Sequence, residues 1–289
     1  MINEIQTRKK KSQWHDVWKR FRKNKAAMSG LIVITILVLS AIFANVIAPE
    51  GFDEQNLTRT FQPPSREHLM GTDNLGRDQF SRIIFGTRTS LQVGFVAVSI
   101  AMVIGSLIGA IAGFFGGKVD NIIMRFVDIL LAIPGILLAI AIASALGTGM
   151  TNLMIAVGIS AIPSYARIVR SAALSVREQE FIEAARAMGG SDTRIIMRHV
   201  LPNCMAPIIV QVTLGLAGAI LSAAGLSFIG LGIMPPTPEW GSMLNVGRRF
   251  IRDHWFLTVF PGLAIVTVVL AFNLVGDGLR DALDPKLKK

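Results

Sequence analysis

Charged residues are scarce in this chain, at 17% of its 289 residues, whereas soluble domains carry about a quarter. Five runs contain no Asp, Glu, Lys or Arg: Ala26–Pro49, Thr89–Gly117, Ile129–Ala166, Val200–Pro238 and His254–Gly276. A helix needs about 20 residues to cross the roughly 30 Å core of a bilayer, so each run can hold at least one span. The sequence therefore excludes a soluble domain and predicts an all-α membrane protein with several spans.

Residues that carry catalysis or bind metals are also few. The single cysteine, Cys204, excludes an intrachain disulfide. The tripeptide Gly116-Gly117-Lys118 lacks the upstream glycine and the following hydroxyl residue of a nucleotide-binding loop. The histidines have no metal-ligand spacing: His15, His68, His199 and His254. We therefore expect no catalytic residue, no metal site and no bound cofactor in this chain.

The middles of the apolar runs hold no carboxylate, lysine or histidine. A charge there is costly and usually marks an ion or proton relay, so its absence disfavours a proton-coupled carrier. Coupling through polar groups such as Asn273 or Ser222 stays open. Arg125 and Asp128, spaced i and i+3, are expected to pair with each other near a span end.

The runs resolve into six predicted spans, because the turn-rich patch at 147–152 divides the run Ile129–Ala166. The predicted limits are 29–48, 89–115, 122–146, 153–170, 205–231 and 256–276. The remaining segments are a basic stretch at 1–28, a loop at 49–88, a polar segment at about 171–204 within a core of 89–276, and a tail at 277–289. Six spans place both termini on one side of the membrane.

Lys and Arg concentrate on the side that holds the termini and the 171–204 segment. The acidic and basic residues of the opposite side balance, so the net charge of +10 lies entirely on the first side. The positive-inside rule makes that side cytoplasmic. We expect a multi-pass protein of the cytoplasmic (inner) membrane with both termini in the cytoplasm.

The basic N-terminal stretch carries an apolar stripe at i, i+3, i+4 and i+7, formed by Trp14, Val17, Trp18 and Phe21. That pattern favours a helix on an anionic leaflet, where each basic residue contributes about 1 kcal/mol, over a nucleic-acid arm. The following apolar run is too long for a secretory signal and predicts an uncleaved span.

The loop at 49–88 contains a turn, His68 to Asp78, that leads into a helix whose narrow apolar face is Phe80, Ile83 and Ile84. We expect that face to lie along the membrane surface. A loop that caps the helix bundle is favoured over one that contacts substrate.

Small residues recur every four positions in two spans. Gly105, Gly109 and Gly113 precede Gly117 in the second span, and Gly215, Ala219 and Ala223 lie in the fifth. Such stripes allow close approach of helix backbones in a bilayer, within one subunit or between two. Pro134, Pro163, Pro207 and Pro261 can bend the spans.

The polar segment predicts two short helices with a glycine elbow. Phe181, Ala184, Ala185 and Met188 fall on one helix face, and Gly189-Gly190 supplies a bend. A second helix is expected over Thr193 to Val200, limited by Pro202.

This segment carries a specific resemblance. Glu183-Ala184-Ala185, Gly189 and Leu201-Pro202 match the EAA-x3-G-x9-I-x-LP signature of permease subunits of bacterial ABC importers, with His199 in place of Ile. The stretch from Arg198 to Asn203 resembles the version in the dipeptide/oligopeptide/nickel family. Gly71–Asp78, Pro235–Gly241 and Asn273–Pro285 are similar to that family as well.

The resemblance implies a type I ABC importer permease fold of six spans with a cytoplasmic coupling helix at the EAA segment. It implies as partners a homologous second permease, two ATPase subunits that bind ATP and Mg, and an external solute-binding protein. The helix would dock in a groove of an ATPase, and Glu183 would orient it through polar contacts. Its apolar face would divide between that groove and the permease, with packing residues Phe181, Ala184, Ala185 and Met188. ATP-driven closure would then swing the spans between inward- and outward-facing states.

Other functions stay as alternatives. A stand-alone carrier or channel predicts mid-span charges or an internal repeat, and a membrane enzyme predicts a catalytic cluster; Asp253-His254 is the nearest candidate for one. Within the family, peptide, nickel and glutathione permeases share these motifs, and peptide transport is preferred.

Overall fold

The computed structural model describes residues 13–284, which fold into helices and loops with no β-strand among them. The all-α prediction is confirmed. The basic cluster at residues 8–11 and the tail beyond residue 284 lie outside the described residues.

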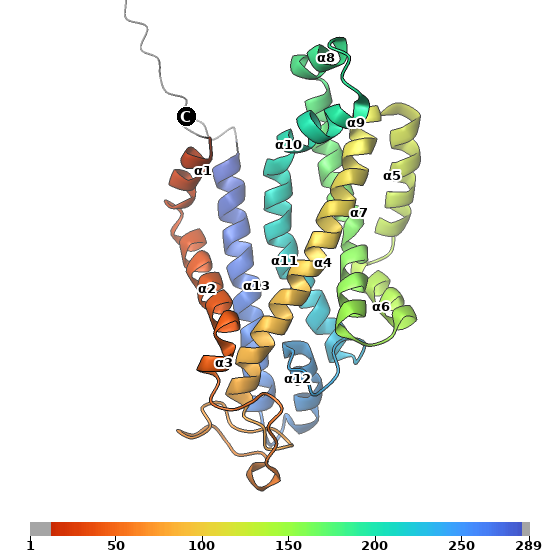
Figure 1. Ribbon diagram of the computed structural model, residues 1–289. Helices are drawn as coiled ribbons and strands as arrows, with labels where there is room; N and C mark the ends of the chain where they lie inside the picture. The colour runs from red at the N-terminus through yellow and green to blue at the C-terminus, as the bar shows by residue number, and fades with distance from the viewer. Residues whose placement is uncertain (1–12, 285–289) are drawn as a thin grey trace, which may run out of the picture.

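Five helices are long and apolar enough to cross a membrane. They are α2 (Lys25–Ile42), α4 (Gln79–Phe115), α7 (Met150–Arg177), α11 (Met205–Phe228) and α13 (Phe256–Leu283). They run roughly side by side along the bundle (Figure 1). Helices α4, α7 and α13 extend beyond their predicted spans, because turns at their ends continue the helical geometry out of the apolar stretch. Helix α2 starts before its predicted span but ends at Ile42, and α11 ends at Phe228, so both end before the predicted limits of 48 and 231.

The third predicted span is a pair of helices rather than one. Helix α5 (Gly117–Leu131) and helix α6 (Gly135–Leu146) are bent by 86° at the break between them and together make the sixth candidate span. Pro134 causes the break: it has no N–H to donate, and it disfavours helical geometry in the residue before it.

Short helices connect the long ones. Helix α1 (Gln13–Phe21) precedes α2, and α3 (Ala44–Ile47) follows it. A 3-10 turn lies at Leu57–Arg59. The 178–204 segment contains α8 (Glu180–Ala187), α9 (Asp192–Ile195), a π-helix at Ile196–Val200 and α10 (Leu201–Asn203). Helix α12 (Trp240–Gly247) and a 3-10 turn at Arg248–Phe250 precede α13.

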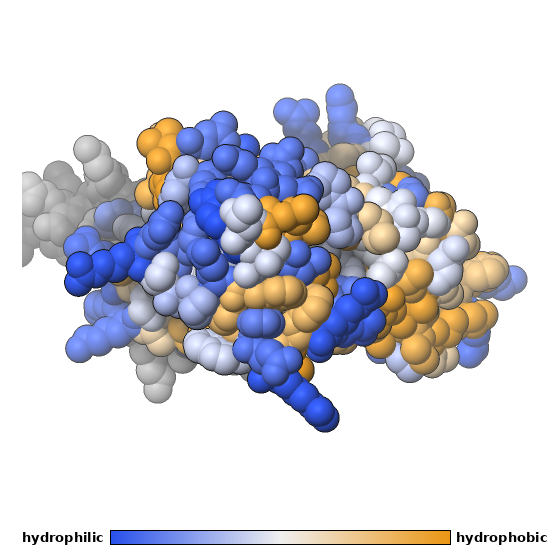
Figure 2. All heavy atoms as spheres, turned by 90° about the horizontal axis from the view of Figure 1, so that it is seen from below, coloured by the Kyte–Doolittle hydropathy of each residue, from blue (hydrophilic) through white to orange (hydrophobic). Residues whose placement is uncertain are grey.

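The two ends of the bundle differ in what they hold. Helix α1, helix α8 and the C-terminal end of α13 share one end, here the α8 end; the 49–78 loop and α12 share the other, the α12 end (Figure 1). Viewed from the α12 end, hydrophilic residues cover much of the face, and hydrophobic residues dominate toward the side where α6 lies (Figure 2). A polar surface at the α12 end is expected where a helix bundle projects out of the bilayer into water.

The main core is built from small and branched residues of four spans. Val93, Ala97, Ala156, Ile220 and Val268 are nearly or fully buried in it. Helix α1 adds a smaller core, in which Phe21 packs with Ala27, Val275 and Ala282. The stripe predicted for α1 therefore divides between the bundle and the outside: Phe21 faces inward, while Trp18 is half exposed.

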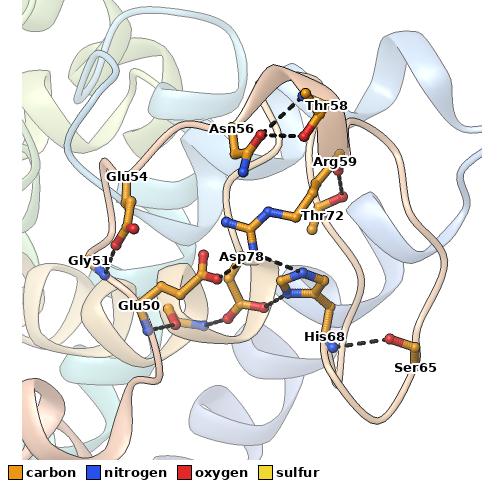
Figure 3. Close-up of polar contacts among 11 residues, drawn as sticks. Glu50, Gly51, Glu54, Asn56, Thr58, Arg59, Ser65, His68, Thr72 and Asp78 are labelled. Carbon is orange, nitrogen blue, oxygen red and sulfur yellow. Dashed lines mark hydrogen bonds and ion pairs between the residues drawn. The ribbon is translucent and has the colours of Figure 1, made fainter.

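The 49–78 loop is held by a buried polar network (Figure 3). His68 Nδ1 lies 3.1 Å from Asp78 Oδ1, and both side chains are 2% exposed. Asp78 Oδ2 also accepts from the Ser81 amide, which caps the start of α4. Arg59 Nη1 donates to Glu50 Oε1 at 2.9 Å. These contacts tie the loop to the start of α4 and so support the interpretation of this loop as a cap on the bundle, although Glu50 Oε2 and Arg59 Nε are buried without a partner.

Helix α4 begins within this network, and its first turns pack partly inside the protein. Ile83 is buried, contrary to the expectation for the face it shares with Phe80 and Ile84. The reason is Trp240, whose indole Nε1 donates to the Ile83 carbonyl oxygen at 3.2 Å. Glu239 caps α12 by accepting from the amides of Gly241 and Ser242, at 2.9 and 2.8 Å. Burial raises the pKa of this carboxyl group.

Candidate functional site: the coupling segment

The inner face of α8 packs on the bundle through Ala185, which the sequence pattern selected, and through Ile182, which it did not. Ile182 is fully buried and Ala185 nearly so. They join a core cluster with Ala110 and Phe114 of α4 and Ala173 of α7. This cluster attaches α8 directly to the ends of two long spans.

A cation–π contact adds to this attachment. The Arg186 guanidinium carbon lies 4.8 Å from the centroid of the Phe114 ring, and Phe114 is 1% exposed. Such contacts contribute about 0.5–2 kcal/mol, depending on desolvation. The end of α4 and the end of α8 are therefore fixed to one another.

The outer face of α8 is apolar and unpartnered. Met188 is 82% exposed and Phe181 is 42% exposed, with Ala184 exposed between them. Glu183 is exposed too and makes no hydrogen bond or ion pair with another described residue. We call Phe181, Ala184 and Met188 the outer α8 face. A helix that only covered its own bundle would leave polar residues here.

Gly189 ends α8 in a left-handed conformation, with φ of +79°. Its amide donates to the Arg186 carbonyl, and the Gly190 amide donates to the Ala185 carbonyl at 3.0 Å. These two hydrogen bonds form the Schellman motif, which favours glycine at the left-handed position. The elbow predicted at 189–190 is therefore a helix stop with fixed hydrogen bonding.

The chain from the elbow to Leu201-Pro202 is helical throughout, so Pro202 does not end the second helix as predicted. A π-helix at Ile196–Val200 leads into α10, in which Pro202 occupies one of the first two positions. Proline is tolerated there because its missing N–H has no helical partner to lose. His199 lies half-buried in the π-helix, and its carbonyl accepts from Asn203 Nδ2 at 2.6 Å.

The glycine stripe of α4 lies against α7. A Cβ atom at Gly105 would lie 2.6 Å from Tyr165 Cβ, and one at Gly113 would lie 2.7 Å from Ala173 Cβ. At Gly109 it would meet the Ala166 carbonyl oxygen. The stripe therefore packs two helices of the same subunit together. The sequence had left open whether it packs helices within one subunit or between two. Close backbone approach of this kind is what small residues permit in a bilayer.

Tyr165 connects α7 to α11. It is 1% exposed, and its hydroxyl donates to the Gln211 carbonyl at 3.2 Å. A Cβ at Gly215 would meet the Tyr165 hydroxyl, and Ala219 is buried on the same helix. Gly215 is therefore small because an aromatic side chain occupies the space beside it.

Ion pairs join α5 to α7. Arg170 donates to both carboxylate oxygens of Asp120, at 2.5 Å each. Asp128 pairs with Arg167 Nη2 at 2.8 Å. The expected pairing of Asp128 with Arg125 was wrong, because α5 lies along α7 and brings an arginine of that helix closer.

Two cavities border the spans on the α7–α11 side. One, of about 170 Å³, is lined by Ser160, Ser164, Gln211 and Ser222 among others. The second, of about 660 Å³, lies at the α8 end between α7, α11 and α13, and it is also lined by Gln211. Polar side chains at membrane depth occur where they line a cavity or face the bundle.

Comparison with known proteins identifies the family of this chain. Residues 105–289 match the family model described as binding-protein-dependent transport system inner membrane component. The chain belongs to this family of permeases. Residues 12–64 match a second model, the N-terminal TM domain of oligopeptide transport permease C. As expected for the family, the permease is a multi-pass inner-membrane protein and its relatives are transport components rather than enzymes.

Among curated relatives, the permease is 52% identical over 277 residues to the dipeptide transport system permease protein DppC of Alkalihalophilus pseudofirmus, covering 96% of this chain and 91% of that one. It is 49% identical over 282 residues to the glutathione transport system permease protein GsiD of Escherichia coli O6:K15:H31, covering 96% and 92%.

Solved structures support the fold of the permease. A chain of the MetNI methionine ABC transporter in an inward-facing conformation matches with a TM-score of 0.57 at 20% identity, covering 70% of this chain and 96% of that one. The predicted ABC importer permease fold is confirmed.

Sequence reasoning missed three residues that shape the site. Ile182 lies one position from the selected face, and the signature does not mention it. Tyr165 is the one tyrosine of the chain, and a lone aromatic residue in a span was a signal available from the sequence. Gln211, an amide inside an apolar run, was another.

Proposed function

We propose that this permease is the membrane subunit of an ATP-driven importer that carries small peptides into the cell. The names of its relatives support this substrate class, since one is a dipeptide permease and the other transports the peptide glutathione. The family description supports an external binding protein as the donor.

The α8 end is the cytoplasmic end in this proposal. The sequence assigns the net charge of +10 to the side of the membrane that holds the 171–204 segment, and positive loops remain in the cytoplasm. Both termini and the outer α8 face then lie in the cytoplasm, where an ATPase can reach them.

The outer α8 face is the observation that carries the proposal. Ile182 and Ala185 already attach α8 to the bundle, so Phe181, Ala184 and Met188 are surplus to that attachment. Exposed apolar groups rimmed by charges such as Glu183 mark a protein interface. We propose that this face docks in a groove of one of two ATPase subunits, which bind ATP and Mg. Leu201 packs against the Ile182 cluster, and the exposed Pro202 follows it in the same signature.

The docked helix transmits movement through fixed contacts. Glycine at 189 and the π-helix give the segment a defined shape, and the Ile182 cluster connects it to α4 and α7. A displacement of α8 therefore moves the ends of two spans that pack closely along the glycine stripe. We propose that this rigid-body motion opens and closes the pathway.

The α7–α11 side faces the pathway in this proposal, opposite a homologous second permease. Hydroxyl groups and the Gln211 amide line its cavities, and they need water or substrate as partners. A peptide, which carries several hydrogen-bonding groups, fits such a wall better than an apolar solute does.

Reconstitution tests the proposal. The permease, its homologous partner, the ATPases and the binding protein are placed in proteoliposomes, and uptake of a labelled dipeptide is measured with and without ATP. We expect uptake only with all components and ATP. Uptake by this chain alone would support a secondary carrier instead, and uptake of nickel but not dipeptide would assign the other substrate class of the family.

A further inference from the structure

A cavity of about 290 Å³ opens at the α12 end, away from the α8 segment and from the α7–α11 side. Its wall is formed by the chain at 227–235, by α12 with the turn after it, and by Asn74 of the 49–78 loop. This volume is at the lower limit of pockets that hold small ligands.

The cavity has a single charged side chain in its wall, Arg249. No described residue forms a hydrogen bond or an ion pair with that guanidinium. Its neighbour Arg248 is engaged differently, with its guanidinium carbon 5.1 Å from the centroid of the Phe228 ring. Arg249 is exposed and therefore available to a ligand from outside.

The wall also holds an unpaired acceptor. The Oδ1 atom of Asn74 is buried and has no hydrogen-bond partner. Buried polar atoms without partners are rare in native structures. This atom has almost no accessible surface, and a rotation of the Asn74 side chain would present it to a ligand N–H in the cavity. Arg249 and Asn74 thus offer a cationic donor and a neutral acceptor in one cavity.

The two sides of the cavity are held together by aromatic contacts. Phe61 lies in the 49–78 loop, and the centroid of its ring is 4.8 Å from the centroid of the Phe250 ring. Phe250 lines the cavity beside Arg249. Phe61 also stacks on His254 at 4.3 Å. These contacts fix the loop that supplies Asn74 against the segment that supplies Arg249, so the site is formed before a ligand arrives.

We propose that this cavity is an entry site for the peptide, in which Arg249 binds the carboxylate and Asn74 Oδ1 accepts from an N–H group of the same molecule. A guanidinium binds a carboxylate through two parallel hydrogen bonds, which a lysine cannot reproduce. The proposal rests on peptide transport as the proposed function and adds where the peptide is first held.

Binding to the complete transporter in nanodiscs, without the external binding protein, tests the site. Saturation-transfer NMR is recorded with Ala-Ala and with Ala-Ala amide, which lacks the carboxylate. We expect Arg249→Gln to weaken binding of Ala-Ala about tenfold, the effect of losing one charge-assisted pair. Arg249→Lys keeps part of the binding, and Ala-Ala amide binds the wild type as weakly as Ala-Ala binds Arg249→Gln.

Arg252→Gln is the matched control, because Arg252 is an exposed arginine on the same segment that does not line the cavity. We expect this variant to bind Ala-Ala as the wild type does. Equal binding of Ala-Ala to the wild type and to Arg249→Gln would overturn the proposal, and so would equal binding of the amide to the wild type.

Uptake in proteoliposomes separates this site from two other outcomes. If Arg249→Gln only raises the binding-protein concentration needed for half-maximal uptake, Arg249 contacts an acidic surface of that protein and the peptide site is refuted. If the wild type takes up no dipeptide at all, the proposed function fails. Normal wild-type uptake that Arg249→Gln leaves unchanged refutes the entry site alone.

Discussion

Replacing Gly189 with valine tests whether the elbow transmits force. Gly189 has φ of +79°, and a Cβ atom there would have no other atom within 4 Å. The cost of a side chain is therefore strain of the backbone and not a collision. A left-handed conformation costs an L-residue roughly 1–2 kcal/mol, with a β-branched residue at the upper end.

A cost of about 2 kcal/mol corresponds to a factor of roughly 30 in the equilibrium between the native elbow and a frayed one. The bundle has its own cores, so we expect Gly189→Val to insert and assemble normally. We expect ATP hydrolysis to continue while the number of peptides taken up per ATP falls. Gly189→Asn should retain most of the uptake, because asparagine tolerates left-handed geometry.

Gly147 provides a matched control, since it has φ of +84° and equally open surroundings but ends α6, far along the chain from α8. Gly147→Val introduces backbone strain at least as great, because Gly147 has ψ of 176° in a region essentially restricted to glycine, and it should leave peptides per ATP unchanged. The reasoning is refuted if Gly189→Val shows wild-type coupling in proteoliposomes, or if Gly189→Asn is as defective as Gly189→Val.

Three further predictions concern packing. Gly109→Ala should lower the thermal unfolding midpoint, because its Cβ would meet a backbone carbonyl. Gly218→Ala, at a helix position with open surroundings, should leave the midpoint unchanged or raise it. Equal midpoints for the two variants would contradict the glycine stripe as a contact surface. Ile182→Ala should destabilise the permease by about 2–5 kcal/mol in a denaturant titration, since the side chain is fully buried; no change would place α8 away from the bundle. Trp240→Phe should cost about 0.5–1.5 kcal/mol by removing a buried hydrogen bond to the Ile83 carbonyl, which keeps the Thr87 hydroxyl as a donor, and a neutral result would argue against the indole hydrogen bond.

The long spans followed directly from the sequence, because a bilayer core requires uninterrupted apolar helices whatever the tertiary structure. The break between α5 and α6 did not follow. Pro134 was recognised as a residue that can bend a span, but an 86° turn depends on how α6 packs against α7. The helix after Asp78 was predicted, but its continuation into the second span as the single helix α4 was not. Burial of Ile83 beneath Trp240, a contact distant in sequence, was also missed.

The coupling segment was located by its signature, and the exposure of its residues was not. Helical spacing grouped Ala185 with Phe181 and Met188, but burial separates them, with Ala185 facing the bundle. Periodicity gives the direction of a side chain around its own helix and not the position of the neighbours. The entry cavity joins residue 74 to residue 249, and no local pattern connects residues so far apart.

Cross-linking from Met188 tests the central claim most directly. Cys204, the native cysteine, is fully buried, so Met188→Cys introduces an accessible thiol on the outer α8 face. In the assembled transporter, we expect a short thiol-to-amine cross-linker to join this position to an ATPase subunit, and Ile182→Cys, which faces the bundle, to give no such product. Absence of the ATPase product from position 188, with the transporter intact and active, would contradict docking through α8.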